Sequence, residues 1–234
     1  MNLQFWGMSL KGVAMAIGFS IFVAELAGYV LHRVMHGERF PALSKAHMIH
    51  HIELYAPDQS MRSEAYKDAT EGRASVGNIG MEWVVPSALI LGVCWVSMCS
   101  LHVTWKYQLL VMVILLGWPI FMFSYLHDRM HISNFWMVRV PVVRVWFTRA
   151  RRLHDIHHRA LNDDGRMDSN FGIGFFFFDR VFRTMAKQHR PLNRLGLQTA
   201  ISRHRSNFGP DEIDRAFHRA SSADPDQRWR RRGN

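Results

Sequence analysis

The stretch His32-Arg-Val-Met-His36, followed eleven residues later by His47-Met-Ile-His50-His51, decides how this chain folds. The same two spacings return in His127-Asp-Arg-Met-His131 and His154-Asp-Ile-His157-His158. Residues three and four apart lie on one face of an α-helix, so each box points two or three imidazoles in one direction. Ten of the 14 histidines fall in these boxes, which scattered structural histidines do not explain. The boxes therefore predict helices that converge on a shared cluster of imidazoles.

The number of imidazoles indicates the kind of site. Neutral imidazole binds iron, zinc, copper and nickel, and one ion takes about four to six ligands, so ten imidazoles fit two ions. The chain has only two cysteines, Cys94 and Cys99, both in an apolar run, which excludes iron–sulfur clusters. We expect two iron ions, with zinc as a substitute in purified protein, and O₂ as co-substrate. The expected ligands are His32, His36, His47, His50, His51, His127, His131, His154, His157 and His158.

Three apolar runs place this cluster beside a membrane. Gly12–Leu31, Trp83–Leu101 and Tyr107–Leu126 are each about 20 residues long, enough for a helix to cross a hydrocarbon core of ~30 Å. Glu25 is the single charged residue in the three runs, and we expect it to face neighbouring helices or the cytosolic end. The formal net charge of +10 suits either nucleic acid or an anionic membrane surface, and the apolar runs favour the membrane. We expect no nucleic-acid partner.

The distribution of basic residues predicts the orientation. The four polar segments in chain order hold one, six, one and 21 Lys and Arg residues. The second and fourth, on one face of the membrane, hold 27 of the 29, and cytosolic loops carry such an excess. All four boxes lie on that face. We therefore expect an all-α integral membrane protein with about three transmembrane helices, interfacial helices and a cytosolic histidine-rich cap. A bacterial inner membrane is favoured, and the endoplasmic reticulum is an alternative.

Composition divides the chain into residues 1–186, the membrane di-iron domain, and residues 187–234, a basic and partly disordered tail. Ile132–Phe147 is apolar but is interrupted by charges and a proline, which predicts an interfacial or shallow re-entrant helix pair. Phe171–Phe178 is too short to cross a membrane. It suits a membrane-dipping turn, a hydrophobic lid, or aromatic anchoring in the interface.

Two aspartates are candidates for orienting the ligands. Asp128 and Asp155 each directly follow the first histidine of a box. Adjacent residues do not share a helix face, so these carboxylates would reach around to the N–H of a neighbouring imidazole. The alternative is that both are ordinary interfacial carboxylates.

The four boxes, together with Asn170-Phe-Gly172 and Phe178-Asp-Arg-Val-Phe-Arg-Thr184, resemble the fatty acid hydroxylase / sterol desaturase superfamily of membrane di-iron oxygenases. The resemblance covers about His32 to Thr184. It implies transmembrane helices under a cytosolic cap that holds two metals, an O₂-dependent oxidation of C–H bonds, and external electrons. The first box has three intervening residues, as in sterol desaturase-like members, whereas fatty acid 2-hydroxylase-like and carotenoid hydroxylase-like members commonly have four. The chain contains no His-Pro-Gly-Gly haem motif, so we expect a separate cytochrome b5- or ferredoxin-like electron donor.

The resemblance also marks Asn170 as a candidate catalytic residue. Its amide would hydrogen-bond a metal-bound water or a ligand imidazole. The alternative is a turn residue, because asparagine tolerates left-handed backbone next to Gly172.

We therefore expect an O₂-dependent hydroxylase of a lipid acyl chain or a similar long apolar substrate. Carotenoid hydroxylase and sterol desaturase-like oxidase are the closest alternatives, because desaturation shares the first hydrogen abstraction. A membrane haem protein would need paired histidines in facing spans, but His102 is the one histidine between Trp83 and Leu126. A metal transporter would need ionisable groups at mid-membrane, where only Glu25 qualifies.

Overall fold

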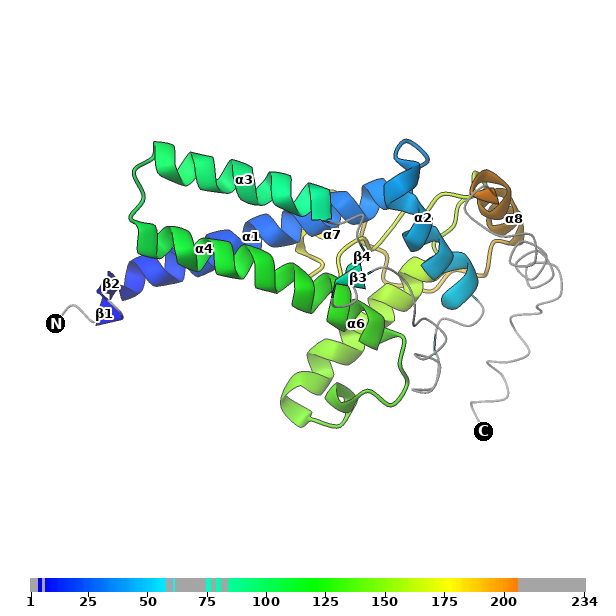
Figure 1. Ribbon diagram of the computed structural model, residues 1–234. Helices are drawn as coiled ribbons and strands as arrows, with labels where there is room; N and C mark the ends of the chain where they lie inside the picture. The colour runs from blue at the N-terminus through cyan, green and yellow to red at the C-terminus, as the bar shows by residue number, and fades with distance from the viewer. Residues whose placement is uncertain are drawn as a thin grey trace.

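The computed structural model describes residues 4–5, 7–57, 61, 75–76, 79–80 and 84–205, and most of these lie in helices. Three long helices lie side by side, and shorter helices gather at one end of them (Figure 1). α1 (Leu10–Met35) packs along α4 (Trp105–Pro119), which also packs against α3 (Val84–Ser100). Small and apolar side chains fill the space between them, with Ala16, Ala24 and Met98 among those buried. This bundle carries the apolar runs of the sequence.

Two stretches of this bundle are long and apolar enough to cross a membrane, Leu10–Met35 and Trp105–Met130. They contain the first and third of the expected apolar runs. The second run forms α3, a shorter apolar helix of 17 residues, and its expected first residue lies outside the described residues. The buried Glu25 carboxylate accepts a hydrogen bond of 2.8 Å from the indole N–H of Trp118, which confirms that Glu25 faces a neighbouring helix.

Two π-helical turns lie next to histidine boxes. α4 continues past Pro119 as η4 (Ile120–Leu126) and then as α5 (His127–Met130), which carries the third box. α2 (Pro41–Ile49) continues as η1 (His50–Leu54), which begins inside the second box. Single π-turns are rare and recur at functional sites, because the wider turn changes which way the following side chains point. Here η1 and η4 fix the direction in which the imidazoles of the second and third boxes point.

Close packing of α1 against η4 depends on Gly28. A Cβ atom added at Gly28 would overlap the ring of Phe123, whereas one added at Gly18 in the same helix would meet nothing within 4 Å. We expect Gly28→Ala to lower the free energy of unfolding by about 1–3 kcal/mol, the usual cost of overpacking. Gly18→Ala is the matched control and should be neutral or slightly stabilising, because alanine favours helix. Thermal unfolding in detergent measures both variants, and equal melting temperatures would contradict this packing.

The segment expected to be an interfacial helix pair is built differently. A single 3₁₀ turn, η5 (Trp136–Val138), is followed by α6 (Pro141–Arg159), one continuous amphipathic helix that also carries the fourth box. Proline is favoured at the first position of a helix, which explains why Pro141 begins α6 rather than breaking it. The first turns of α6 expose Val142 and Val145, and one face of its later turns, beginning with Phe147, Ala150 and Leu153, is buried. α6 starts away from the bundle and runs back toward the short helices (Figure 1).

The packed structure continues beyond the expected boundary at residue 187. α8 (Arg194–Arg203) buries Leu197, Ala200 and Ile201 against Tyr29 and Met48. Residues 194–203, inside the segment expected to be the tail, therefore pack on the helical core, and the division of the chain at residue 187 stays a prediction. The Arg-rich remainder, 206–234, lies outside the described residues.

The remaining elements are short. α7 (Phe177–Val181) contacts α1, and two small antiparallel pairs are formed by β1 (Gln4–Phe5) with β2 (Met8–Ser9) and by β3 (Ser75–Val76) with β4 (Ile79–Gly80). Most of the polar loop that leads to β3 also lies outside the described residues.

Candidate metal centre

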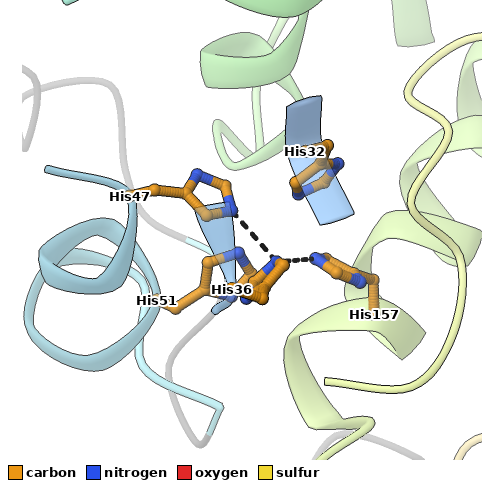
Figure 2. Close-up of side chains that lie close together, drawn as sticks. All are labelled: His32, His36, His47, His51 and His157. Atoms are coloured by element: carbon orange, nitrogen blue, oxygen red, sulfur yellow. Dashed lines mark hydrogen bonds between the residues drawn. The ribbon is translucent and has the colours of Figure 1, made fainter. Parts of the chain in front are cut away.

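The ten box histidines gather into two groups of five, and within each group one ring nitrogen of every imidazole lies within 4.8 Å of the others. Cluster 1 contains His32, His36, His47, His51 and His157. Cluster 2 contains His50, His127, His131, His154 and His158. Figure 2 shows the five imidazoles of cluster 1 turned toward one another from three separate segments. Nine of the ten side chains are buried, and that of His127 is partly buried.

The two clusters draw on both halves of the chain in the same way. Cluster 1 takes the i, i+4 pairs of the first two boxes, and cluster 2 takes those of the last two. The remaining ligand of each cluster comes from the other half, His157 for cluster 1 and His50 for cluster 2. Neighbouring residues on a helix point about 100° apart, so an adjacent pair of histidines cannot face one ion. The HxxHH spacing therefore places a ligand in each cluster and interlocks the two halves.

Distances between the nitrogens fit a metal shell. In cluster 1, His36 Nε2 lies 3.0 Å from the Nε2 atoms of both His47 and His157. In cluster 2, His131 Nε2 lies 3.2 Å from that of His50 and 3.0 Å from that of His154. Two nitrogens bound at right angles to one ion at about 2.1 Å are about 3.0 Å apart. Ring nitrogens carry one proton or one lone pair, so contacts shared with two others are poor hydrogen bonds and good ligand positions.

Buried ring nitrogens without a hydrogen-bond partner also indicate that the clusters bind metal ions. His32 Nε2, His127 Nε2 and both ring nitrogens of His51 are buried and have no hydrogen-bond partner. Buried polar atoms are nearly always paired, because an unmade hydrogen bond costs about 1–3 kcal/mol. A metal ion in each cluster would satisfy His32 Nε2, His127 Nε2 and one of the two nitrogens of His51. The donor sets therefore fit the two ions that the sequence predicts.

Backbone carbonyls hold the outer nitrogens of several ligands. The Nδ1–H groups of His32 and His157 each donate at 2.6 Å, to the carbonyls of Phe171 and Ser169 respectively. His158 Nδ1–H donates to the carbonyl of Tyr55 at 2.8 Å. Because a carbonyl only accepts, each bond fixes the proton on Nδ1 and leaves the Nε2 lone pair directed into the cluster. The tautomer that metal binding requires is thus built into the fold.

Burial sets the charge of the ligands. Burial, with smaller contributions from neighbouring imidazoles, lowers the pKa of His157 to about 3 and that of His51 well below its ordinary range. The pKa values of His36, His47, His50, His154 and His158 are lowered for the same reasons. These imidazoles are therefore neutral at pH 7, which is the form that binds metal.

Acid should destabilise the protein through this cluster. The folded pKa of His157, about 3, lies below the unfolded value of about 6.5, so the unfolded state binds more protons below pH 6.5. The free energy of unfolding of metal-free protein should therefore fall as the pH drops from about 6.5 toward 3. Bound metal should be released over the same range, because protons compete for the ligands. Thermal unfolding of chelator-treated protein at pH 7.5 and pH 5 measures the effect, and an unchanged melting temperature would contradict neutral buried imidazoles.

Asn170 lies next to the centre but contacts different partners from those expected. Its amide N–H groups donate to the backbone carbonyls of Leu153 and Ala186, both at 2.9 Å, and its Oδ1 accepts from the N–H of Ala186. The backbone uses both N–H groups, so the expectation that this amide reaches a metal-bound water or an imidazole stays a prediction. Asn170 also has a φ of 58°, as the turn interpretation predicts. Asn170 thus links Leu153, the residue of α6 directly before His154, to Ala186 in the segment after α7.

The expected role of Asp128 and Asp155 in orienting the imidazoles stays a prediction. Asp155 Oδ2 lies 3.6 Å from Nε2 of His189, a histidine outside the boxes.

Asp179 is a buried residue that the sequence analysis did not select. Its carboxylate accepts hydrogen bonds from the backbone N–H groups of Phe171 at 2.8 Å and Gly172 at 2.7 Å, and from the hydroxyl of Thr184 at 2.8 Å. Burial raises the pKa of Asp179, and these hydrogen bonds oppose that effect. The signal in the sequence was the motif Phe178–Thr184, which contains both Asp179 and its hydrogen-bond partner Thr184.

Aromatic rings close the space around both clusters. The ring of Phe171 is buried, with its centroid 5.5 Å from that of His157 and 6.0 Å from that of His32. Tyr55 stacks on His131 with centroids 3.9 Å apart. Further along the apolar segment expected to be a lid, Phe175 is half-exposed and stacks against Trp118 of α4. The segment therefore begins as a wall of cluster 1 and reaches the surface of the bundle at Phe175.

Comparison with known proteins adds an independent finding. The family described as fatty acid hydroxylase matches residues 17–184, which begin in α1 and end at Thr184. The matched residues contain all ten imidazoles of the two clusters. Searches among curated proteins and solved structures returned no match. The chain belongs to the fatty acid hydroxylase family, within the fatty acid hydroxylase / sterol desaturase superfamily.

Proposed function

We propose that this protein is a membrane-bound, O₂-dependent hydroxylase that acts on a lipid acyl chain or a similarly long apolar molecule. One observation carries the proposal: ten imidazoles form two five-nitrogen clusters at the end of an apolar helix bundle, in a member of the fatty acid hydroxylase family. A hydrolytic zinc enzyme usually spends three protein ligands on one ion, which does not account for this arrangement. Paired redox metals do account for it.

Clusters 1 and 2 would each hold one iron ion. Iron bound there supplies the oxidising power needed to break an unactivated C–H bond with O₂, and the chemistry is the cofactor's own. The protein contributes fixed geometry. Backbone carbonyls hold the outer nitrogens of His32, His157 and His158, while Phe171 and Tyr55 exclude water from the ligand shells.

An integral membrane location supports an apolar substrate. α3 exposes Leu89, Val93 and Val96, each more than half accessible, and a large apolar outer surface is stable only when something apolar covers it. We propose that lipid covers it, so that α3 joins the two longer helices as a third span. The basic residues concentrated on the side of the boxes favour a cytosolic metal centre in a bacterial inner membrane, with the endoplasmic reticulum as an alternative. Electrons would come from a separate cytochrome b5- or ferredoxin-like protein.

Metal analysis and lipid mass spectrometry together test this function. Purified protein should contain about two iron or zinc ions per chain, because each cluster offers one coordination sphere. Cells that express the protein under ¹⁸O₂ should accumulate a lipid carrying one ¹⁸O atom, and cells that express His131→Ala should not. An unsaturated, unlabelled product would favour the sterol desaturase-like alternative. A Soret band would favour the haem alternative, and absence of any new oxidised lipid would contradict the proposal.

A further inference from the structure

A single peptide group lies between Asp179 and a ligand of cluster 1. The N–H of the peptide that joins Phe171 to Gly172 donates to Asp179 Oδ2 at 2.7 Å. The C=O of the same peptide accepts from Nδ1–H of His32 at 2.6 Å. A peptide group is conjugated, so a negative charge on its N–H side increases the electron density on its oxygen. The carboxylate is therefore linked to the imidazole through one conjugated unit.

Hydrogen bonds favour the ionised form of the Asp179 carboxylate and fix it in place. It accepts from three donors, because the N–H of Phe171 and the hydroxyl of Thr184 also donate to it, each at 2.8 Å. Both of its oxygens therefore act as acceptors, as expected of an ionised carboxylate. Thr184 uses its proton on Asp179, so the hydroxyl of Tyr29, at 3.1 Å, donates to Thr184 Oγ1. Tyr29 lies three residues before His32 on α1, which closes a ring of hydrogen bonds around the Asn170–Gly172 turn.

We infer that Asp179 is a positioning residue for the metal of cluster 1, acting through the 171–172 peptide on His32. This inference rests on the proposed metal binding. Metal-ligating histidines commonly donate their outer N–H to a carboxylate or a carbonyl, which orients the ring and strengthens it as a donor. Here a carbonyl and a carboxylate act one behind the other: the carbonyl of Phe171 accepts the N–H of His32, and the buried carboxylate of Asp179 polarises that carbonyl. His157 donates to the carbonyl of Ser169, directly before the Asn170–Gly172 turn, so a second ligand of cluster 1 lies beside this anchor.

Cluster 2 provides an internal reference within the same chain. Its ligand His158 is held by the carbonyl of Tyr55, which lies after η1 and far in sequence from the Asn170–Gly172 turn. Loss of Asp179 should therefore weaken metal binding in cluster 1 and leave metal binding in cluster 2 unchanged. Loss of a partner behind a ligand typically reduces metal affinity about 10–100-fold.

Zinc binding by the full chain in detergent micelles tests the inference. Chelator-treated protein is titrated with zinc against a competing chelator of known affinity, and circular dichroism monitors the fold. Wild type should bind two ions. Asp179→Asn keeps the side-chain shape and removes the charge, and it should weaken one ion about 10–100-fold and leave the other. Asp179→Glu keeps the charge and changes the shape, and it should lose less affinity than Asp179→Asn.

Two further variants complete the test. Replacing Gly172 with glycolic acid makes the 171–172 link an ester, which removes the N–H and retains Asp179; it should weaken the same ion. Asp168→Asn is the matched control, since Asp168 pairs with Arg190 at 2.7 Å, and it should bind both ions as wild type does. Wild-type affinity at both positions in Asp179→Asn or the ester variant would overturn the inference, and so would loss of both ions together. Failure of wild type to bind zinc would instead contradict the proposed function.

Discussion

Replacement of His157 by alanine should empty cluster 1, leave cluster 2 loaded, and abolish turnover. His157 belongs to the fourth box, whose other histidines, His154 and His158, serve cluster 2. The mirror variant, His50→Ala, should empty cluster 2 and leave cluster 1. After dialysis against a chelator, each variant should retain about one ion per chain where wild type retains about two, because four imidazoles hold an ion more weakly than five. Turnover should fall at least about 100-fold in both, more than the loss of a residue behind a ligand usually causes.

A histidine outside the boxes provides the control for this experiment. His102 is exposed in the turn between α3 and α4 and has a φ of 52°. Asparagine tolerates this left-handed backbone, so His102→Asn removes the imidazole with little strain. It should keep two ions and full turnover. Normal turnover in His157→Ala, or loss of both ions in either box variant, would show that the two clusters are not separate coordination shells.

Replacement of Asn170 should have the largest effect on stability. Asn170→Gly keeps the left-handed φ of 58° but leaves the carbonyls of Leu153 and Ala186 and the N–H of Ala186 without their partner. At about 1 kcal/mol net for each hydrogen bond, the free energy of unfolding should fall by about 3 kcal/mol. Turnover should fall as well, because Leu153 directly precedes His154.

Asn170→Asp distinguishes the hydrogen bonds of the side-chain amide from the left-handed backbone conformation at this position. Aspartate has the same shape, but it places an acceptor oxygen against the two carbonyls that now receive amide protons. It should therefore destabilise the protein at least as much as glycine does, by thermal unfolding in detergent. If Asn170→Gly unfolds at the wild-type temperature and turns over normally, Asn170 is only a turn residue.

The structure confirms some sequence expectations because they depend on helix geometry alone. The i, i+4 spacing places His32 with His36 and His127 with His131 on common faces in any helix. The apolar runs likewise form helices wherever their length allows the backbone to satisfy its own hydrogen bonds. The spanning lengths of Leu10–Met35 and Trp105–Met130 follow from composition in this way.

Other features were out of reach because they depend on residues distant in sequence. α8 buries Gly196, Leu197, Ala200 and Ile201, which are too few apolar residues to stand out in an Arg-rich stretch, so the sequence predicted a tail there. The sequence analysis gave Asp179 no role of its own, because its partners Phe171 and Gly172 lie eight and seven residues away and meet its carboxylate only in the fold.

The sequence by itself determined which ten imidazoles are candidate ligands, the helices that carry them and the expectation of two ions, because spacing along a helix controls which side chains share a face. Only the tertiary structure decided which cluster each imidazole joins. His50 and His51 differ by about 100° around a helix axis, and the spacing does not say which partner each direction meets. The packing of α1, η1, α5 and α6 supplies that answer, because contacts between distant segments fix the rotation of each helix about its own axis.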